Sequence, residues 1–195
     1  VRKTATVSAS DKGFAIQSAD KAFQFKLRGL LQFDGRFYLD DKAPRTNDGF
    51  LLRRVEPTFE LTFSKILFFR IQPNFAPDSA TVCDAYGELR LNPAFNVRAG
   101  KFKAPIVLEN LQSSSATTFN ERGLPNELGP NRDYGVQLGG SLFDDTLDYA
   151  VGVFNGAPDG RDGKQQPESD NRKEIAARLF AEPFKNSPGF FQRSE

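Results

Sequence analysis

Residues 23–37 read FQFKLRGLLQFDGRF, and this stretch decides the fold class. Apolar residues and glycines occupy its odd positions, and polar residues occupy its even positions with the single exception of Leu30. A period of two that is sustained over the whole stretch predicts a β-strand with one apolar and one polar face. The stretch is also far longer than the roughly 5–6 residues of an average strand in globular proteins.

The same alternation returns along the chain and predicts further strands at residues 55–63, 67–75, 81–91, 95–99, 134–142, 146–154 and 174–183. We therefore expect an all-β chain with eight strands and no substantial helix. Pro57 and Pro73 lack a backbone N–H, so we expect a bulge or distortion at each of them. Residues 1–12 are interpreted as an N-terminal extension, and residues 13–195 as the β-domain.

The connections between these strands alternate in length. Short turns at residues 64–66, 92–94 and 144–145 alternate with longer loops at about 41–49, 76–80, 103–132 and 156–172. In an up-and-down sheet the short turns would all lie at one end, which is typical of antiparallel outer-membrane β-barrels. A soluble β-sandwich also alternates apolar and polar residues, with its apolar face inward. Strand length and loop asymmetry favour the barrel, because spanning strands need about 9–11 residues.

Composition excludes several classes of function. The 195 residues carry a formal charge of +1, which does not favour a nucleic-acid partner. The chain has no His, so His-based catalytic triads and most zinc sites are excluded. A single cysteine, Cys83, cannot form an internal disulfide, and no apolar run is long enough for a transmembrane helix. We expect no enzyme activity, no metal site and no cofactor.

Several motifs, in this order along the chain, resemble the phosphate-selective porin O and P family of Gram-negative outer membranes. They are Phe23–Gln32, Asp48–Arg54, Asp84–Tyr86, Arg98–Lys103, Leu111–Ser115, Pro130–Leu138, Gly152–Gly156 and Ala176–Phe180. Each is short, but their shared order over residues 13–184 makes the resemblance fairly specific.

The resemblance implies a homotrimer of 16-stranded barrels, embedded in outer-membrane lipid, with a water-filled pore for phosphate or other small anions. Eight strands in 195 residues would make up only half of such a barrel. We therefore interpret the chain as the N-terminal half of a longer porin.

In a porin the polar strand faces line the lumen. The alternation assigns these cations to the lumen: Lys26, Arg28, Arg36, Arg54, Arg70, Arg90, Arg98 and Arg178. The same faces carry equally many acids: Asp34, Glu56, Glu60, Asp84, Glu88, Asp148, Glu174 and Glu182. Arginine suits phosphate because its planar donor fork matches the phosphate oxygens. Because the charges balance, anion selectivity requires that the two signs are segregated, with cations at the constriction.

The neighbours Arg53 and Arg54 form a conspicuous pair. Adjacent strand residues face opposite ways, so a regular strand would place Arg53 against lipid, where it costs about 2–4 kcal/mol at mid-bilayer. Arg53 reaches water only near the loop end of its strand or beside a bulge. The resemblance implies that both arginines serve an anion path, and the alternative is an arginine that snorkels to the membrane interface.

The long loop 103–132 is the third of the long loops. Long loops without secondary structure are uncommon unless they are functional. The resemblance implies that this loop folds inward and narrows the pore, and the alternative is an ordinary surface loop. The cationic residues that flank this loop or lie within it are Lys101, Lys103, Arg122 and Arg132, and Ser113, Ser114 and Ser115 add neutral donors.

The first functional hypothesis is a passive outer-membrane channel that prefers anions such as phosphate or polyphosphate. A general or cation-preferring porin is the alternative within the same fold. A soluble all-β binding module with a phenylalanine-rich core is the alternative from another class.

Overall fold

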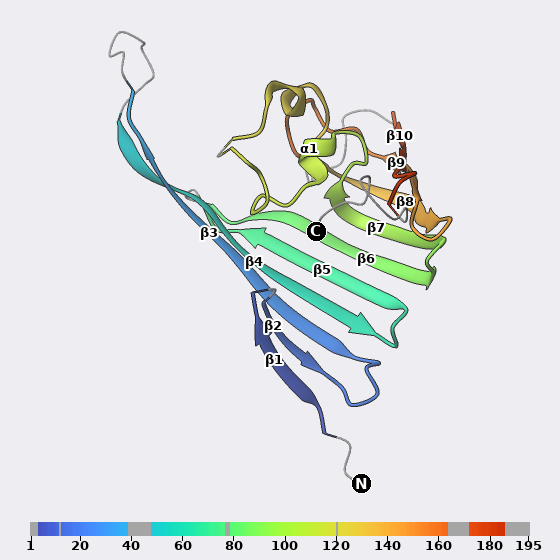
Figure 1. Cartoon of the computed structure of the whole chain (residues 1–195). Coiled ribbons are helices and arrows are strands. Elements are labelled where there is room, and N and C mark those ends of the chain that lie inside the picture. The colour runs from blue at the N-terminus through green and yellow to red at the C-terminus, as the bar shows by residue number, and fades with distance from the viewer. Residues whose placement is uncertain are drawn as a thin grey trace.

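The computed structural model describes residues 4–11, 13–38, 48–76, 79–119, 121–163 and 172–185. Within these ranges the chain forms one ten-stranded antiparallel sheet, in which each strand pairs with its neighbours in the sequence (Figure 1). The strands are β1 (Thr6–Ser10), β2 (Gly13–Gln17), β3 (Gln24–Arg36), β4 (Gly49–Phe63), β5 (Leu67–Asn74), β6 (Thr81–Asn92), β7 (Phe95–Lys103), β8 (Arg132–Leu142), β9 (Leu147–Phe154) and β10 (Glu174–Ala181). The predicted all-β, up-and-down architecture is confirmed, although the sheet is not closed.

The eight expected strands correspond to β3–β10, and the hairpin of β1 and β2 was not predicted. Both strands of that hairpin are only five residues long, and every residue of β1 is exposed, so β1 has no buried face that would impose an alternation. The described helices are α1 (Leu108–Leu111) and the 3₁₀ turn η1 (Leu124–Leu128), both in the long loop after β7. Neither approaches the length and apolar character that a membrane-crossing helix requires.

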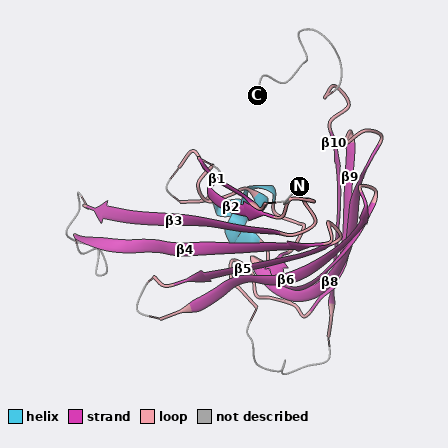
Figure 2. Cartoon of the chain, turned by 90° about the horizontal axis from the view of Figure 1, so that it is seen from below, coloured by secondary structure: helices cyan, strands magenta, loops and turns pink. Residues whose placement is uncertain are grey.

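The two faces of the sheet differ in the way that a membrane strand requires. Leu31, Phe33 and Phe50 are 72%, 65% and 71% exposed, whereas Glu56 and Asp84 are only 6% and 5% exposed. Apolar side chains therefore lie on the outside and charged side chains on the inside. This distribution contradicts the soluble β-sandwich, in which the apolar face is buried. The sheet also curves, so that β8–β10 turn away from the direction of β3–β6 (Figure 2).

The alternation of short and long connections is confirmed. Two residues separate β6 from β7, whereas residues 104–131 separate β7 from β8. In the β4–β5 turn, Ser64 and Lys65 have φ angles of 51° and 63°, which suit a tight hairpin with the right-handed twist of its strands. The long strands β3 and β4 have 13 and 15 residues, enough to cross a bilayer at a tilt.

The two prolines behave differently. The register between β5 and β6 shifts between Gln72 and Pro73, so the bulge predicted at Pro73 is confirmed. Pro57 stays in register with Gly29 of β3, so the strand shows no bulge on that side. On the β5 side of β4 the predicted distortion is present: the pairing of β4 with β5 includes Phe59 but not Pro57, and a backbone hydrogen bond from the Phe75 N–H to the Val55 oxygen lies beyond the interruption.

A small apolar cluster lies among the described residues between the strands and the long loop. Phe102, Ala104, Phe154 and Ala176 are each no more than 2% exposed, and Tyr86 packs against them. The ring centroids of Phe102 lie 5.8 Å from Tyr86 and 5.4 Å from Phe154, in edge-to-face geometry. The cluster fixes the end of β7, where the long loop begins.

Gly100 permits the close contact of β7 with β6, and Gly100→Ala is expected to lower the stability of the protein. Gly100 has a φ of +134°, and a Cβ there would lie 2.3 Å from the Ala85 carbonyl oxygen and 2.7 Å from the Tyr86 Cα. Backbone strain alone costs about 1–3 kcal/mol. The thermal unfolding midpoint, measured by circular dichroism in detergent, should fall. Gly29→Ala is the control, because nothing lies within 4 Å of its would-be Cβ, and equal midpoints for the two variants would contradict the expectation.

Candidate functional site

The polar face of the sheet and the long loop enclose a cavity of about 870 Å³. Strands β3 to β8 supply one side of it, and the loop residues Leu111 and Ser113–Ser115 supply the other. Among the described residues its lining includes six cationic side chains, which are Lys26, Arg28, Arg70, Arg98, Lys103 and Arg132. The acidic side chains of the lining are Asp11, Glu56 and Asp84. The lining therefore holds more cationic than acidic side chains, although Arg28 and Arg98 are paired with Glu60 and Glu88 from outside it.

A chain of ion pairs crosses the sheet beneath this cavity. Glu60 of β4 pairs with Arg28 of β3, and it lies 3.8 Å from Nη1 of Arg70 on β5. Asp84 of β6 continues the chain, because its carboxylate lies 3.4 Å from Nε of Arg70 and 2.7 Å from Nε of Arg132 on β8. Every carboxylate in this chain is thus shared between two arginines.

The third acidic group near the arginines, Glu56, is also engaged. Its carboxylate accepts a hydrogen bond of 2.6 Å from Nε2 of Gln72 and lies 3.8 Å from Nε of Arg54. Asp11, at the tip of the β1–β2 hairpin, is exposed to solvent. The carboxylates of Glu56, Glu60 and Asp84 are therefore each close to a neighbouring arginine. The positive charge that they do not neutralise lies on the cations without a carboxylate partner.

Two lysines of the cavity have no carboxylate partner in the described part of the chain. Lys26 lies on β3 at the edge of the cavity, and Lys103 ends β7. Nζ of Lys103 donates a hydrogen bond of 3.0 Å to the backbone oxygen of Gln112. Nη2 of Arg122 donates to the same oxygen at 3.3 Å and to Oγ of Ser114 at 3.2 Å. The loop thus brings an arginine and a serine next to a strand lysine.

Residues of the long loop line the same cavity as residues on the polar face of the strands, so the loop covers part of that face. Its two ends are held together by Nδ2 of Asn110, which donates to the Asn131 oxygen at 3.1 Å. Arg132 is only 8% exposed and joins this end of the loop to Asp84. The prediction that the loop turns inward agrees with this position. The burial of Arg122, together with repulsion from Arg132 and Arg54, lowers the pKa of Arg122.

A β-bulge resolves the orientation of Arg53 and Arg54. Gln32 pairs with Arg54 and Phe33 pairs with Leu52, so Arg53 is the extra residue of β4. Both arginines consequently line a second, polar cavity of about 280 Å³, together with Arg122 and Arg132. The same lining carries four acidic side chains, which are Glu56, Glu121, Glu127 and Asp162. The interpretation of Arg53 as a snorkelling interfacial arginine is therefore wrong.

Glu121 of the long loop binds Arg53 and also Arg36. Its Oε1 accepts from Nη2 of Arg36 at 2.7 Å, and its two oxygens lie 3.2 and 3.1 Å from Nε and Nη2 of Arg53. The hydrogen bonds from Arg53 hold the pKa of Glu121 below its usual value. Nothing in the sequence pattern singled out Glu121, because a loop has no periodicity that indicates direction.

The structure separates two predicted pore residues from the cavities. Nε of Arg90 lies 2.5 Å from Glu88, and its guanidinium carbon lies 3.9 Å from the centre of the Phe68 ring. Nζ of Lys101 donates to the Val82 oxygen at 2.9 Å and lies 3.4 Å from Asp162. Neither residue lines a described cavity, although both were assigned to the anion path.

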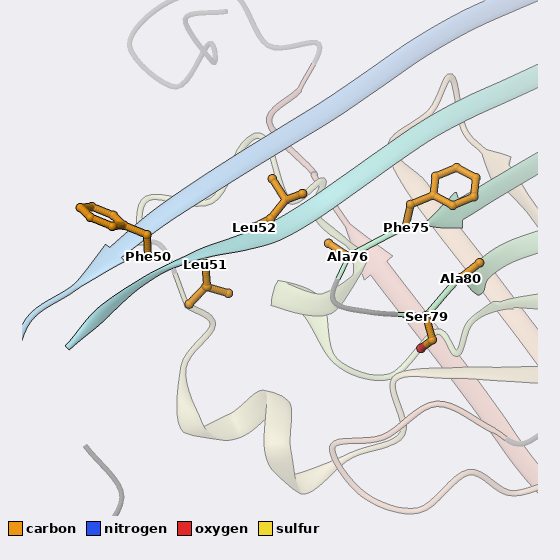
Figure 3. Close-up of a pocket in the computed structure, with 7 residues that line it drawn as sticks. All are labelled: Phe50, Leu51, Leu52, Phe75, Ala76, Ser79 and Ala80. Carbon is orange, nitrogen blue, oxygen red and sulfur yellow. The ribbon is translucent and has the colours of Figure 1, made fainter. Parts of the chain in front are cut away.

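A further pocket lies at the loop end of β4 and beside the β5–β6 connection (Figure 3). Its lining is Phe50, Leu51, Leu52, Phe75, Ala76, Ser79 and Ala80. It contains no charged group, so it offers no site for an ion. Within the described ranges there is also no cluster of three or more groups that could hold a metal ion.

Comparison with known proteins places these observations in a family. No curated protein matches the sequence. The family model for the phosphate-selective porins O and P, in contrast, matches residues 23–185, which include β3 to β10 and the long loop. The match covers most of the chain and includes every residue of the two charged cavities except those of the β1–β2 hairpin. The chain therefore belongs to the phosphate-selective porin O and P family.

Proposed function

We propose that the protein is an outer-membrane diffusion channel that prefers anions, phosphate and polyphosphate among them. The family is one of outer-membrane porins, so a channel is favoured over an enzyme. The observation that carries the anion preference is the segregation of charge: cations outnumber acids in the cavity beneath the loop. A cationic lining raises the local anion concentration and replaces part of the hydration shell of the ion.

The barrel of this channel needs more strands than the described sheet contains. Strands β1 and β10 are unpaired edges among the described residues, and a bilayer does not tolerate an open edge. We infer that further strands complete the barrel, in agreement with the interpretation of the chain as half of a porin. The homotrimer and the lipid partners that the family resemblance implies stay predictions.

The mechanism requires only binding and release. An anion is attracted by Lys26 and Lys103, exchanges water for guanidinium and hydroxyl donors near Arg122 and Ser114, and leaves because no single site is strong. Arg28, Arg70 and Arg132 are shared with carboxylates, which limits the affinity of each of them for a passing anion.

The direct test is the reversal potential of the full-length protein in a planar bilayer under a KCl gradient, followed by titration with phosphate. The expected result is a reversal potential whose sign shows that chloride is more permeant than potassium, together with a chloride current that phosphate reduces. A potential on the cation side, or near zero, would favour the general or cation-preferring porin instead.

Removal of individual cavity arginines tests the pathway itself. Arg28→Ala and Arg54→Ala are each expected to lower chloride conductance without unfolding the barrel, because each removes a cavity cation. Single-channel recordings measure the effect, and circular dichroism confirms folding. Arg90→Ala is the matched control, since Arg90 pairs with Glu88 outside both cavities. If all three variants conduct like the wild type, the two arginines do not contribute to the path.

A further inference from the structure

Glu121 carries a carboxylate that is placed where an entering anion would be bound. It belongs to the long loop, and it reaches Arg36 on β3 and Arg53 on β4 at the same time. The contact to Arg53 is two-pronged, with Nε and Nη2 donating to different oxygens. This is the arrangement by which guanidinium groups also bind phosphate oxygens.

The bulge in β4 makes this contact possible. In a regular strand, Arg53 would lie on the apolar face and Leu52 on the polar face, so that only Arg36 of this pair of arginines would reach Glu121 of the loop. The bulge therefore places Arg53 on the polar side of the sheet, and the Glu121 carboxylate of the loop accepts the hydrogen bonds of its guanidinium group. Glu121 lines the cavity of about 280 Å³ and also a further cavity of about 440 Å³, whose lining includes Arg36 and Ser114, so the contact lies at the boundary of these two cavities.

The contact is accessible to solutes. The side chains of Arg36, Arg53 and Glu121 are 39%, 34% and 52% exposed, in contrast to the buried pair of Asp84 and Arg132. Exposed ion pairs contribute only about 0.2–1 kcal/mol each. An anion in the cavity can therefore exchange with the Glu121 carboxylate, whereas it cannot exchange with Asp84 at a comparable cost.

We propose that Glu121 is a tethered competitor for the transported anion, which holds Arg36 and Arg53 until an entering oxyanion displaces its carboxylate. The proposal rests on the proposed anion-channel function and names a residue that sets its affinity. The competition weakens anion binding at the two arginines. It also speeds release, because the carboxylate returns to them as the anion leaves.

The test compares Glu121→Gln with the wild type in planar bilayers, using chloride current and inorganic phosphate as the blocking probe. Glutamine keeps the size of the side chain but removes the competing charge. The phosphate concentration that halves the chloride current should fall by about fivefold, the size expected for loss of exposed ion pairs. The residence time of phosphate in single-channel records should lengthen accordingly.

Glu109→Gln is the matched control. Glu109 lies in the same loop and its carboxylate accepts hydrogen bonds of 3.1 and 2.9 Å from the Gly123 N–H, but it pairs with no arginine in the described residues. Its replacement removes the same charge and keeps an acceptor for that N–H. The blocking concentration should stay at the wild-type value. Glu121→Asp, which keeps the charge but shortens its reach, should lie between the wild type and Glu121→Gln.

A purely structural role for Glu121 gives a different result. If Glu121 only fastened the loop, Glu121→Gln would raise potassium and chloride conductance together and leave the phosphate blocking concentration unchanged, which would overturn the proposal. A wild-type channel without anion preference would instead overturn the proposed function. In that case a shift of the reversal potential toward anions in Glu121→Gln, absent in Glu109→Gln, would still support control of the two arginines by Glu121.

Discussion

Replacement of both Lys103 and Arg122 by glutamate is expected to move the reversal potential of the channel from the anion side to the cation side. Both side chains donate to the Gln112 oxygen, so their charges lie close together where the loop meets the strands. Neither forms an ion pair in the part of the chain that the structure describes, so their charges are not cancelled locally. Reversal of both signs strongly changes the field where the loop meets the strands, because the two fixed charges act there at short range.

The measurement is the reversal potential under a KCl gradient, with ion permeability ratios derived from it. The neutral pair of variants, Lys103→Gln with Arg122→Gln, should give an intermediate potential. Lys21→Glu with Lys65→Glu is the control, because these exposed lysines lie in the short turns before β3 and after β4. An unchanged potential in the glutamate variant would remove the loop from the selectivity determinants of the channel.

Asp84→Asn is expected to give the largest loss of stability among single charge changes at the cavity. Asp84 is 5% exposed and holds Arg132, itself 8% exposed, at 2.7 Å. Removal of one partner of a buried ion pair costs about 3–5 kcal/mol, because the remaining charge is left without compensation. Arg70 loses its 3.4 Å contact in the same variant, which interrupts the ion-pair chain between β5 and β8.

The midpoint of urea unfolding in lipid vesicles, measured by circular dichroism, should fall markedly for Asp84→Asn. Asp34→Asn is the control: its carboxylate lies 3.6 Å from Arg36, a half-exposed side chain that keeps Glu121 as a partner. Loss of this pair is expected to cost less than loss of the Asp84–Arg132 pair, because Arg36 is 39% exposed and is not left without a partner. Equal unfolding midpoints for the two variants would contradict the expectation, because they would show that water stabilises the charge of Arg132 as well as Asp84 does.

The strand pattern was predictable because it depends on local geometry. Alternation over residues 23–37 indicated the two faces of β3, and the structure places Leu31 and Phe33 outside accordingly. The β1–β2 hairpin was missed because all five residues of β1 are exposed, so no buried face imposes an alternation. The alternation of faces along a strand is also lost wherever a bulge inserts a residue. The sequence pattern therefore could not predict the face on which Arg53, the inserted residue of β4, lies.

The sequence by itself determined that this protein is a long-stranded β-sheet with a polar and an apolar face, and which family it resembles. These properties depend on residue order and on the period of two along each strand. Only the tertiary structure decided how charge is distributed on the polar face. Ion pairs such as Asp84 with Arg132 join residues far apart in the sequence, so equal numbers of charges became a cation-rich cavity. The partner of Arg53 was decided in the same way, because only the folded loop brings Glu121 to the bulge.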